Sequence, residues 1–182
     1  MSGADVLVWM DLEMTGLDVE RDVIVEIAAL ATSATTLEPL DAGLSVVVAQ
    51  PPEVLAGMSD FVRQMHERSG LLTEIGTGGV PLEDAGRKVL EYIKGHVPEP
   101  RTVPLCGNSI GMDRRFLARY LPEIEEHLHY RSIDVSSIKE LCRRWYAEPF
   151  SARPQKTEDH RALSDIGASI VELRYYRETI FK

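Results

Sequence analysis

The sequence is poor in cysteine, in long apolar runs and in positive charge, and each shortage narrows the possible classes of protein. Cys106 and Cys142 are the only cysteines among 182 residues, which leaves no zinc-binding spacing and suits a reducing compartment. No apolar run reaches 18 residues and no basic-then-apolar leader opens the chain, so we expect a cytoplasmic protein without a membrane span. Lysine and arginine total 20 against 29 acids, a net charge of −9, which argues against binding along a long duplex.

The remaining composition is that of an ordinary globular protein. Hydrophobic residues make up 44% and charged residues 27% of the chain, and both values are typical of a folded soluble domain. The length fits one domain, and neither a repeat nor a linker divides it. We therefore expect a single domain over residues 1–182, in which part of the negative charge can form a metal site.

The pattern of apolar and polar residues predicts an α/β fold, a mixed five-stranded sheet flanked by helices. Short connections join the first three strands, which favours antiparallel hairpins, and helices alternate with strands thereafter. We expect strands near residues 6–13, 22–31, 44–48, 103–107 and 130–135. We expect helices over 59–66, 81–95 and 161–176, one capped by Asn108 or Ser109 and limited by Pro122, and one capped by Ser136. Residues 50–57, 70–79 and 147–158 are expected to be loops.

Two acids, Asp11 and Glu13, follow an apolar run over residues 6–10. Side chains two residues apart on a strand share a face, so both carboxylates should project together from a buried strand. At ~4 Å and an effective dielectric of ~20 they would repel by ~4 kcal/mol, unless a cation or a shared proton offsets the repulsion. The alternative is a solvated strand edge. Glu26, in the second strand, is expected at a surface or edge position rather than beside these acids.

Two further acids lie on expected helices. Asp113, Phe116, Leu117 and Tyr120 recur at helical spacing, so Asp113 is expected on the inward face of its helix. The alternative for Asp113 is a solvated acid that interacts favourably with the helix dipole. Asp165 flanks the apolar stripe of the last helix. Like Asp11 and Glu13, both acids would therefore lie where a core element ends.

His160 precedes Asp165 by five residues and would not share its helical face, so we place His160 in the preceding loop, with a plain surface histidine as the alternative. Together, Asp11, Glu13, Asp113 and Asp165 can hold two divalent cations, and hard carboxylate oxygens favour Mg²⁺ or Mn²⁺ over zinc. Such a pair stabilises the attacking and leaving oxygens of a displacement at phosphorus. A neutral histidine beside the attacking water can accept its proton.

Three segments, residues 11–18, 107–117 and 160–166, resemble the motifs of the DEDDh 3′–5′ exonuclease family. Together with residues 129–136 they are similar to the oligoribonucleases within that family, and the resemblance extends over nearly the whole chain. It implies a ribonuclease H-like fold and a homodimer. It also implies release of 5′-mononucleotides from the 3′ end of very short RNA, of about two to five nucleotides. Dinucleotides would be the chief substrates, including the linear product of cyclic di-GMP opening.

The resemblance also assigns roles to single residues. Four acids, Asp11, Glu13, Asp113 and Asp165, would hold the two metal ions, and His160 would be the general base. Leu17 and Phe61 would pack around a base. The far end of the substrate would be bound by His66, Ser109, Arg131 and Ser136. Tyr130 would reach in from the partner subunit.

Each implied substrate contact has a simpler explanation. Leu17 fits an ordinary turn residue, Phe61 a core side chain, His66 a solvated helix residue and Arg131 a surface salt bridge. Tyr130 fits a dimer contact equally well. A base stacked on an aromatic ring contributes ~1–3 kcal/mol, which favours Phe61 over Leu17 as a true contact.

Two departures from the family pattern affect the expected site. Phe61 stands where the family often has tryptophan and offers a smaller stacking face. Glu158 and Asp159, just before His160, add negative charge that would raise the pKa of His160 or repel the substrate. Two other functions remain open: a proofreading-type DNA exonuclease, which shares the motifs, and a non-catalytic binder of short nucleotides.

Overall fold

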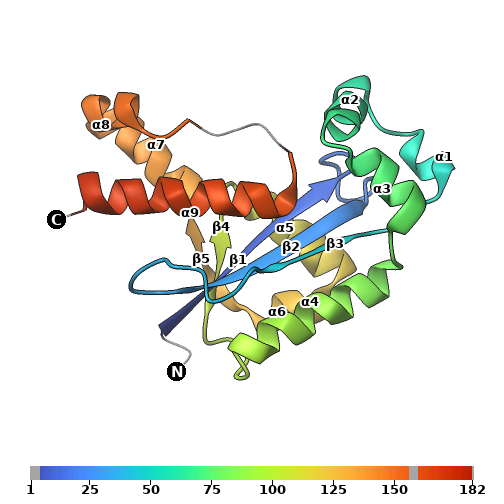
Figure 1. Cartoon of the computed structure of the whole chain (residues 1–182), viewed down its shortest axis with the longest axis horizontal. Helices are drawn as coiled ribbons and strands as arrows, with labels where there is room; N and C mark the ends of the chain where they lie inside the picture. The colour runs from blue at the N-terminus through green and yellow to red at the C-terminus, as the bar shows by residue number, and fades with distance from the viewer. Residues whose placement is uncertain (1–4, 156–159, 182) are drawn as a thin grey trace.

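The computed structural model describes residues 5–155 and 160–181, and its centre is a five-stranded mixed sheet (Figure 1). The strands are β1 (Val6–Met14), β2 (Ile24–Ser33), β3 (Leu44–Val47), β4 (Pro104–Gly107) and β5 (His129–Asp134), in the order β3-β2-β1-β4-β5. β1, β2 and β3 pair antiparallel, whereas β4 runs parallel to both β1 and β5. The predicted five strands and their mixed pairing are therefore confirmed.

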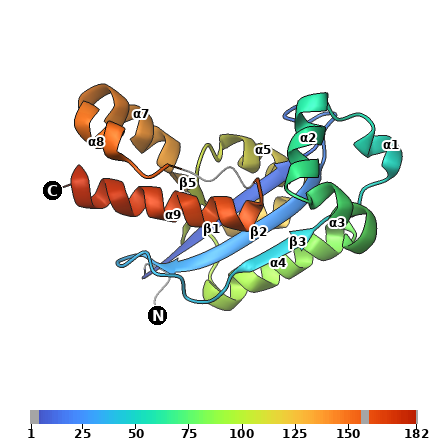
Figure 2. The same cartoon turned by 45° about the horizontal axis from the view of Figure 1, so that its top comes forward.

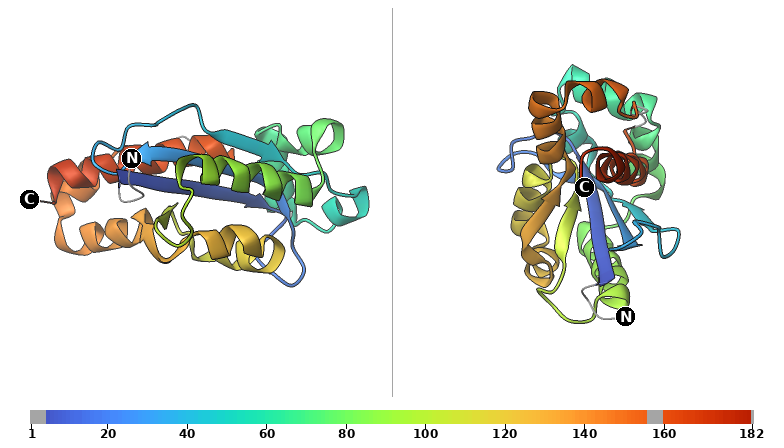
Figure 3. Two further views of the ribbon diagram at one scale, coloured as in Figure 1. Left: turned by 90° about the horizontal axis from the view of Figure 1, so that it is seen from below. Right: turned by 90° about the vertical axis from the view of Figure 1, so that its left-hand side faces the viewer.

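Helices cover both faces of the sheet, as the two views of Figure 3 show. One face carries α4 (Leu82–His96), α5 (Gly111–Tyr120) and α6 (Pro122–His127), and the other carries α7 (Val135–Trp145) and α9 (Ala162–Thr179). The last of these, α9, lies across β1 and β2. Within the described ranges, no helix is both long enough and apolar enough to cross a membrane.

The alternation of side chains along β1 divides the core into two halves. Val8, Met10 and Leu12 pack with α4, α5 and α6, whereas Trp9 packs with α7 and α9. Successive strand residues point to opposite faces. The odd-numbered acids that follow Trp9 therefore point toward the side of the sheet that α9 covers.

The predicted loops contain three short helices, so these loop predictions are wrong in part. α1 (Pro52–Leu55), α3 (Leu71–Gly78) and α8 (Ala147–Ala152) lie within them, and α2 (Asp60–Arg68) begins after its predicted cap Ser59. Leu71 and Ile75 are buried against Val25 and Met58, so tertiary packing outweighs the low helix propensity of the glycines in α3. Figures 1 and 2 show α2 and α3 gathered where β1 ends and α9 begins.

Two predicted helix caps are wrong. The side chain of Asn108 donates to Glu172 of α9, and α5 begins only after Ile110. The residue that caps α7 is Asp134, whose carboxylate accepts from the backbone N–H of Ser136. In both places a long-range or neighbouring polar contact takes the side chain that local sequence rules assign to the cap.

β1 extends beyond β4, which leaves one side of its end open. The parallel pairing stops at Trp9 and Cys106, while β1 continues to Met14. At the end of β4, Gly107 passes close to β1, because a Cβ on it would lie 2.9 Å from the carbonyl oxygen of Met10. The chain then turns into α5, whose first residues face the unpaired part of β1.

Candidate catalytic centre

Three carboxylates meet at the end of β1. Ligand oxygens of Asp11, Glu13 and Asp165 all lie within 4.8 Å of one another. The first two occupy alternate positions of β1, and the third comes from the first turn of α9, directly above that face of the sheet. The structure therefore brings together three of the four acids that were expected to hold metal ions.

The fourth acid, Asp113, contacts the backbone of β1 between Asp11 and Glu13. It is buried on the same face of α5 as Phe116 and Leu117, so the predicted inward position is confirmed. Its Oδ1 accepts a hydrogen bond of 3.0 Å from the backbone N–H of Leu12. That amide lies beyond the pairing of β1 with β4, and Asp113 supplies the acceptor that a neighbouring strand would otherwise provide.

The electrostatics of the group favour a bound cation. Burial raises the pKa of Glu13 to about 8, and the carboxylates of Asp165, Glu26 and Asp113 add to the rise. Burial also raises the pKa of Asp113 to about 6. A divalent cation among these oxygens would offset both the cost of burying the charges and the repulsion between the carboxylates. Because every member of the group is a carboxylate, the donor set fits a hard cation such as Mg²⁺ or Mn²⁺.

His66 is fully buried beside Glu13, so its reading as a solvated helix residue is wrong. Its Nε2 lies 2.9 Å from the carbonyl oxygen of Met14, which only accepts, so Nε2 carries the proton. The other ring nitrogen, Nδ1, lies 3.9 Å from the Glu13 carboxylate. Burial lowers the pKa of His66, which favours the neutral ring. Its predicted contact with substrate stays a prediction.

His160 lies in the segment before α9, as expected, and not on the helix. Its backbone has φ +48°, in the left-handed region, and its side chain is half-buried. A non-glycine residue in this region is held there by its surroundings, and such residues are frequent at functional sites. The predicted effect of Glu158 and Asp159 concerns residues outside the described part of the chain.

Glu26 corrects a prediction, because it is buried and not at a surface or edge position. It lies directly opposite Glu13 in the ladder between β1 and β2, with 1% of its side chain exposed. Arg161 pairs with it at 3.1 Å, and the Ser45 hydroxyl donates to it at 2.7 Å. Burial of this charge is made tolerable by partners from distant segments, Arg161 above all, which the sequence around Glu26 does not reveal.

Ser109 and Ser136, which were predicted to bind the far end of the substrate, share one partner, Asp134. Its Oδ1 accepts from the backbone N–H of Ser109 at 2.9 Å and from the hydroxyl of Ser136 at 2.6 Å. The backbone of Ser109 has φ +62°. One oxygen of Asp134 therefore binds both Ser109, whose backbone is in the left-handed region, and Ser136 at the start of α7. Its position before Val-Ser at a strand-to-helix boundary was a capping signal that we did not use.

The other predicted substrate contacts are exposed. Leu17, Phe61 and Tyr130 have 66%, 70% and 76% of their surface exposed, so Phe61 is not a core side chain. The guanidinium carbon of Arg131 lies 5.7 Å from the centre of the Tyr130 ring. All four are available to a ligand in this chain.

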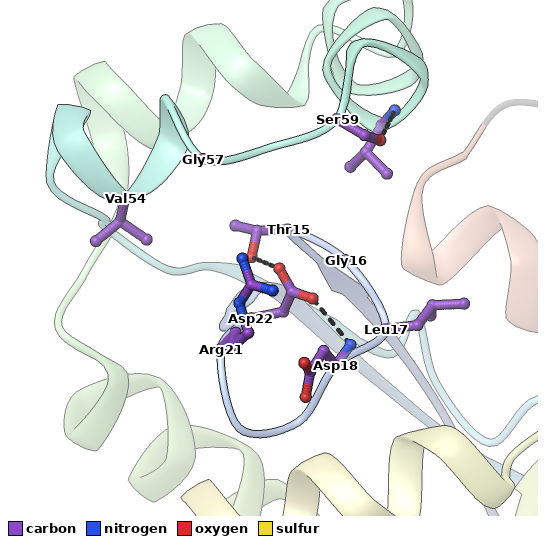
Figure 4. A pocket seen from close by; sticks show the side chains of 10 residues that line it. Thr15, Gly16, Leu17, Asp18, Arg21, Asp22, Val54, Gly57 and Ser59 are labelled. Atoms are coloured by element: carbon purple, nitrogen blue, oxygen red, sulfur yellow. Dashed lines mark hydrogen bonds between the residues drawn. The ribbon is translucent and has the colours of Figure 1, made fainter.

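A cavity of about 520 Å³ adjoins the turn that carries Leu17. In Figure 4 the Asp22 carboxylate organises this turn, accepting from the hydroxyl of Thr15 and the backbone N–H of Asp18. The Leu17 side chain extends away from Asp22. The turn is therefore fixed from inside and presents its apolar residue outward.

Comparison with known sequences identifies close relatives over most of the chain. The exonuclease family RNase T matches residues 8–173. Oligoribonuclease of Streptomyces griseus is 52% identical over 177 residues, which cover 97% of this chain and 87% of that protein. Oligoribonuclease of Mycobacterium bovis is 53% identical over 177 residues, which cover 97% and 82%.

Comparison with solved structures bears on the fold. Exonuclease I of Methylocaldum szegediense superposes with a TM-score of 0.66 at 19% identity. The match covers 97% of this chain but 41% of that one, so the chain corresponds to about two fifths of exonuclease I. At this identity the likeness concerns the fold alone, and it confirms the predicted ribonuclease H-like architecture.

Proposed function

The chain belongs to the oligoribonuclease family of exonucleases, and from this membership we propose that it hydrolyses short oligoribonucleotides from their 3′ ends. The substrates are RNAs of about two to five nucleotides, chiefly dinucleotides, and the products are 5′-mononucleotides. Residues 1–182 act in this proposal as a single exonuclease domain. The cofactor is a pair of divalent cations, Mg²⁺ or Mn²⁺.

The observation that carries the proposal is the carboxylate group of Asp11, Glu13 and Asp165 with Asp113 behind it. Burial, with the neighbouring carboxylates added to it, raises the pKa of Glu13, so the ionised acids are costly here without a cation. When bound, a pair of divalent cations would stabilise the charge on the attacking and leaving oxygens of phosphodiester hydrolysis. The four acids would hold these ions.

His160 acts as the general base in the proposed reaction. It accepts a proton from the water that attacks the phosphorus of the 3′-terminal nucleotide. A new P–O bond forms to the water oxygen, and the bond to the 3′ oxygen of the preceding nucleotide breaks. That oxygen takes up a proton, so one 5′-mononucleotide leaves and the RNA is one nucleotide shorter.

The exposed residues around the carboxylates supply the substrate contacts. Leu17 and Phe61 pack against bases, because their side chains reach out from the turn after β1 and from α2. Ser109, Ser136 and Arg131 bind the phosphate at the far end of the substrate, for which a guanidinium fork is well suited. For His66, buried beside the acids, the same role is inferred from the family resemblance alone.

The net charge of the chain supports a preference for short substrates. With a charge of −9, a long RNA would meet repulsion outside the site, whereas a dinucleotide carries few phosphates. A contact at the far end of a dinucleotide would also be lost when further nucleotides follow.

We further propose that the protein is a homodimer. Large apolar side chains are exposed on α7 and just after α9, among them Trp145 at 66% and Phe181 at 55%. Figure 1 shows α7, α8 and the end of α9 together at one end of the molecule. Exposed aromatic side chains are enriched at interfaces between subunits. Tyr130 would reach the site of the other subunit.

The proposed location is the cytoplasm. Both cysteines, Cys106 and Cys142, are free and buried. Unpaired thiols are typical of a reducing compartment. This agrees with an RNA substrate.

The deciding experiment supplies the protein with Mg²⁺ or Mn²⁺ and compares a labelled RNA dinucleotide, a longer RNA and a DNA dinucleotide. We expect mononucleotide release, fastest from the RNA dinucleotide and abolished in Asp11→Asn. Release from none of the three substrates would refute catalysis and favour the non-catalytic binder. Preference for DNA would favour the proofreading-type exonuclease, and equal rates on both RNA lengths would refute the length preference. Full activity in His160→Ala would remove the role of His160.

A further inference from the structure

Arg161 lies between His160 and the first residue of α9, and its guanidinium joins three elements. Nε and Nη2 donate to the Glu26 carboxylate of β2 at 3.1–3.3 Å. Nη1 and Nη2 donate to the Glu74 carboxylate of α3 at 2.8 and 2.9 Å. Every N–H-bearing nitrogen of the guanidinium therefore has a carboxylate partner.

Glu26 extends this contact to the start of α9. Its Oε2 accepts from the backbone N–H of Ala162 at 3.2 Å, in addition to the guanidinium. A helix leaves its first N–H groups without partners inside the helix. Glu26, which is far away in sequence, therefore caps α9, and the start of the helix is attached directly to the strand opposite Glu13.

The position of this attachment matters for the site. Arg161 follows His160 directly, and Asp165 lies one helical turn beyond. A rotation or shift of the first turn of α9 would move the Asp165 carboxylate away from Asp11 and Glu13. Since a buried ion pair contributes little net stability, its principal effect here is on geometry.

We propose that Arg161 is a positioning residue for the proposed hydrolysis: through its ion pair with the buried Glu26 it holds His160 and Asp165 against the acids of β1. It also neutralises Glu26, so that a fifth carboxylate does not compete for the cations. This inference rests on the proposed function, and it assigns Arg161 no contact with substrate.

The two halves of the bridge differ in burial, which provides a matched control. The side chain of Glu26 is 1% exposed, whereas that of Glu74 is 48% exposed. An exposed ion pair is screened by water and contributes little. Glu74→Gln should therefore change activity little, although it removes a negative charge that faces the same guanidinium.

Steady-state kinetics on the dinucleotide test the proposal. We expect Arg161→Ala to lower kcat by about 100-fold, the effect of misplacing catalytic groups by about 1 Å. KM should stay within about threefold, because the substrate contacts are untouched. Arg161→Lys keeps the charge but lacks the planar fork, and should fall between wild type and Arg161→Ala. Glu74→Gln should stay within about threefold of wild type.

A double variant separates positioning from stability. Arg161→Ala leaves Glu26 charged and buried without its cation, which favours unfolding. Arg161→Ala with Glu26→Gln removes that charge and should recover the melting temperature but not kcat. A folded double variant with wild-type kcat would overturn the proposal, as would an Arg161→Ala protein whose loss lies in KM alone.

Two readouts do not depend on activity. Hydrogen exchange at the amides of residues 162–165 should accelerate in the double variant and stay unchanged in Glu74→Gln. Calorimetric titration with Mn²⁺ alone should show affinity about tenfold weaker in the double variant, because Asp165 no longer faces Glu13. Unchanged exchange and Mn²⁺ affinity would refute the role of Arg161 even if wild type proved inactive on RNA, a result that would separately refute the proposed function.

Discussion

The carboxylate of Asp113 bonds to the backbone N–H of Leu12, 101 residues earlier in the chain. Leu12 lies between Asp11 and Glu13, so this bond holds the segment that carries both acids on the side opposite its pairing with β2. It forms where β4 has ended and β1 continues without a partner on that side. Asp113 thus acts on the site in two ways, through its charge and through the backbone of β1.

These two contributions of Asp113 can be separated by substitution. Asp113→Asn keeps an acceptor for Leu12 and should keep its stability, yet lose at least about 100-fold in kcat because a charge proposed to hold the metal ions is gone. Asp113→Ala also leaves a buried amide unpaired and should lose a further ~1–3 kcal/mol of unfolding free energy. Urea unfolding and dinucleotide turnover measure the two effects. Full activity in Asp113→Asn would contradict the assignment.

The raised pKa of Glu13 predicts how metal-free stability depends on pH. The folded protein binds the proton until about pH 8, whereas the unfolded chain releases it near 4.5. Without metal, the free energy of unfolding should therefore fall as pH rises between these values, by at most ~1.4 kcal/mol per pH unit from this group. Urea unfolding with a chelator at pH 6, 7 and 8 measures it.

Glu13→Gln is the control for this pH dependence. In this variant the free energy of unfolding should decline less between pH 6 and 8. The glutamine side chain has no proton to release when the chain unfolds, whereas Glu13 of the wild type does. Mn²⁺ affinity of wild type should increase over the same range, because the ion competes with the proton. Identical slopes for wild type and Glu13→Gln would show that Glu13 does not titrate there.

Phe61 should affect substrate binding and not folding. Its ring is exposed, so Phe61→Ala should leave the melting temperature nearly unchanged. Loss of base stacking of ~1–3 kcal/mol corresponds to a KM about 5–150 times higher on the dinucleotide. Phe61→Trp offers a larger ring and should lower KM. An unchanged KM in Phe61→Ala would show that no substrate base stacks on Phe61.

Asp134 should matter as a hydrogen-bond acceptor rather than as a charge. It holds Ser109 and Ser136 through one oxygen, and Asp134→Asn retains an oxygen at that position. We expect Asp134→Ala to reduce the ratio of dinucleotide to longer-RNA rates about tenfold, as the loss of one partly buried hydrogen-bond acceptor would. Asp134→Asn should largely keep this ratio. Competition assays with both RNAs measure it, and equal ratios in all three proteins would refute this role.

Trp145 tests the proposed homodimer. A charge in an apolar interface is strongly unfavourable, so Trp145→Asp should yield a monomer by light scattering while staying folded. Wild type should scatter as a dimer at the same concentration. Activity of the monomer should fall if Tyr130 acts across the interface, and a monomeric wild type would refute the proposal.

The local pattern of the sequence was sufficient for the strands and for the placement of most acids. The apolar run before Asp11 and the alternation through Glu13 fixed their common face, because side chains on a strand alternate whatever lies around it. Helical spacing likewise placed Asp113 inward. Helix α3 and the cap of α5 were missed, because burial of Leu71 and the contact of Asn108 with Glu172 depend on segments far apart in sequence. The cap of α7 is a local contact between Asp134 and Ser136, and the sequence alone did not distinguish which of the two residues forms it.

The sequence by itself determined which residues could do chemistry: an acid pair on a buried strand, an inward acid on one helix, an acid beside the apolar stripe of the last helix and a histidine just before that helix. Only the tertiary structure decided how they are held. It brought Asp165 to the acids of β1, placed Asp113 behind Leu12 and buried Glu26 under Arg161. Periodicity reports the face on which a side chain lies, whereas an ion pair or a backbone hydrogen bond between distant segments exists only after the chain has folded.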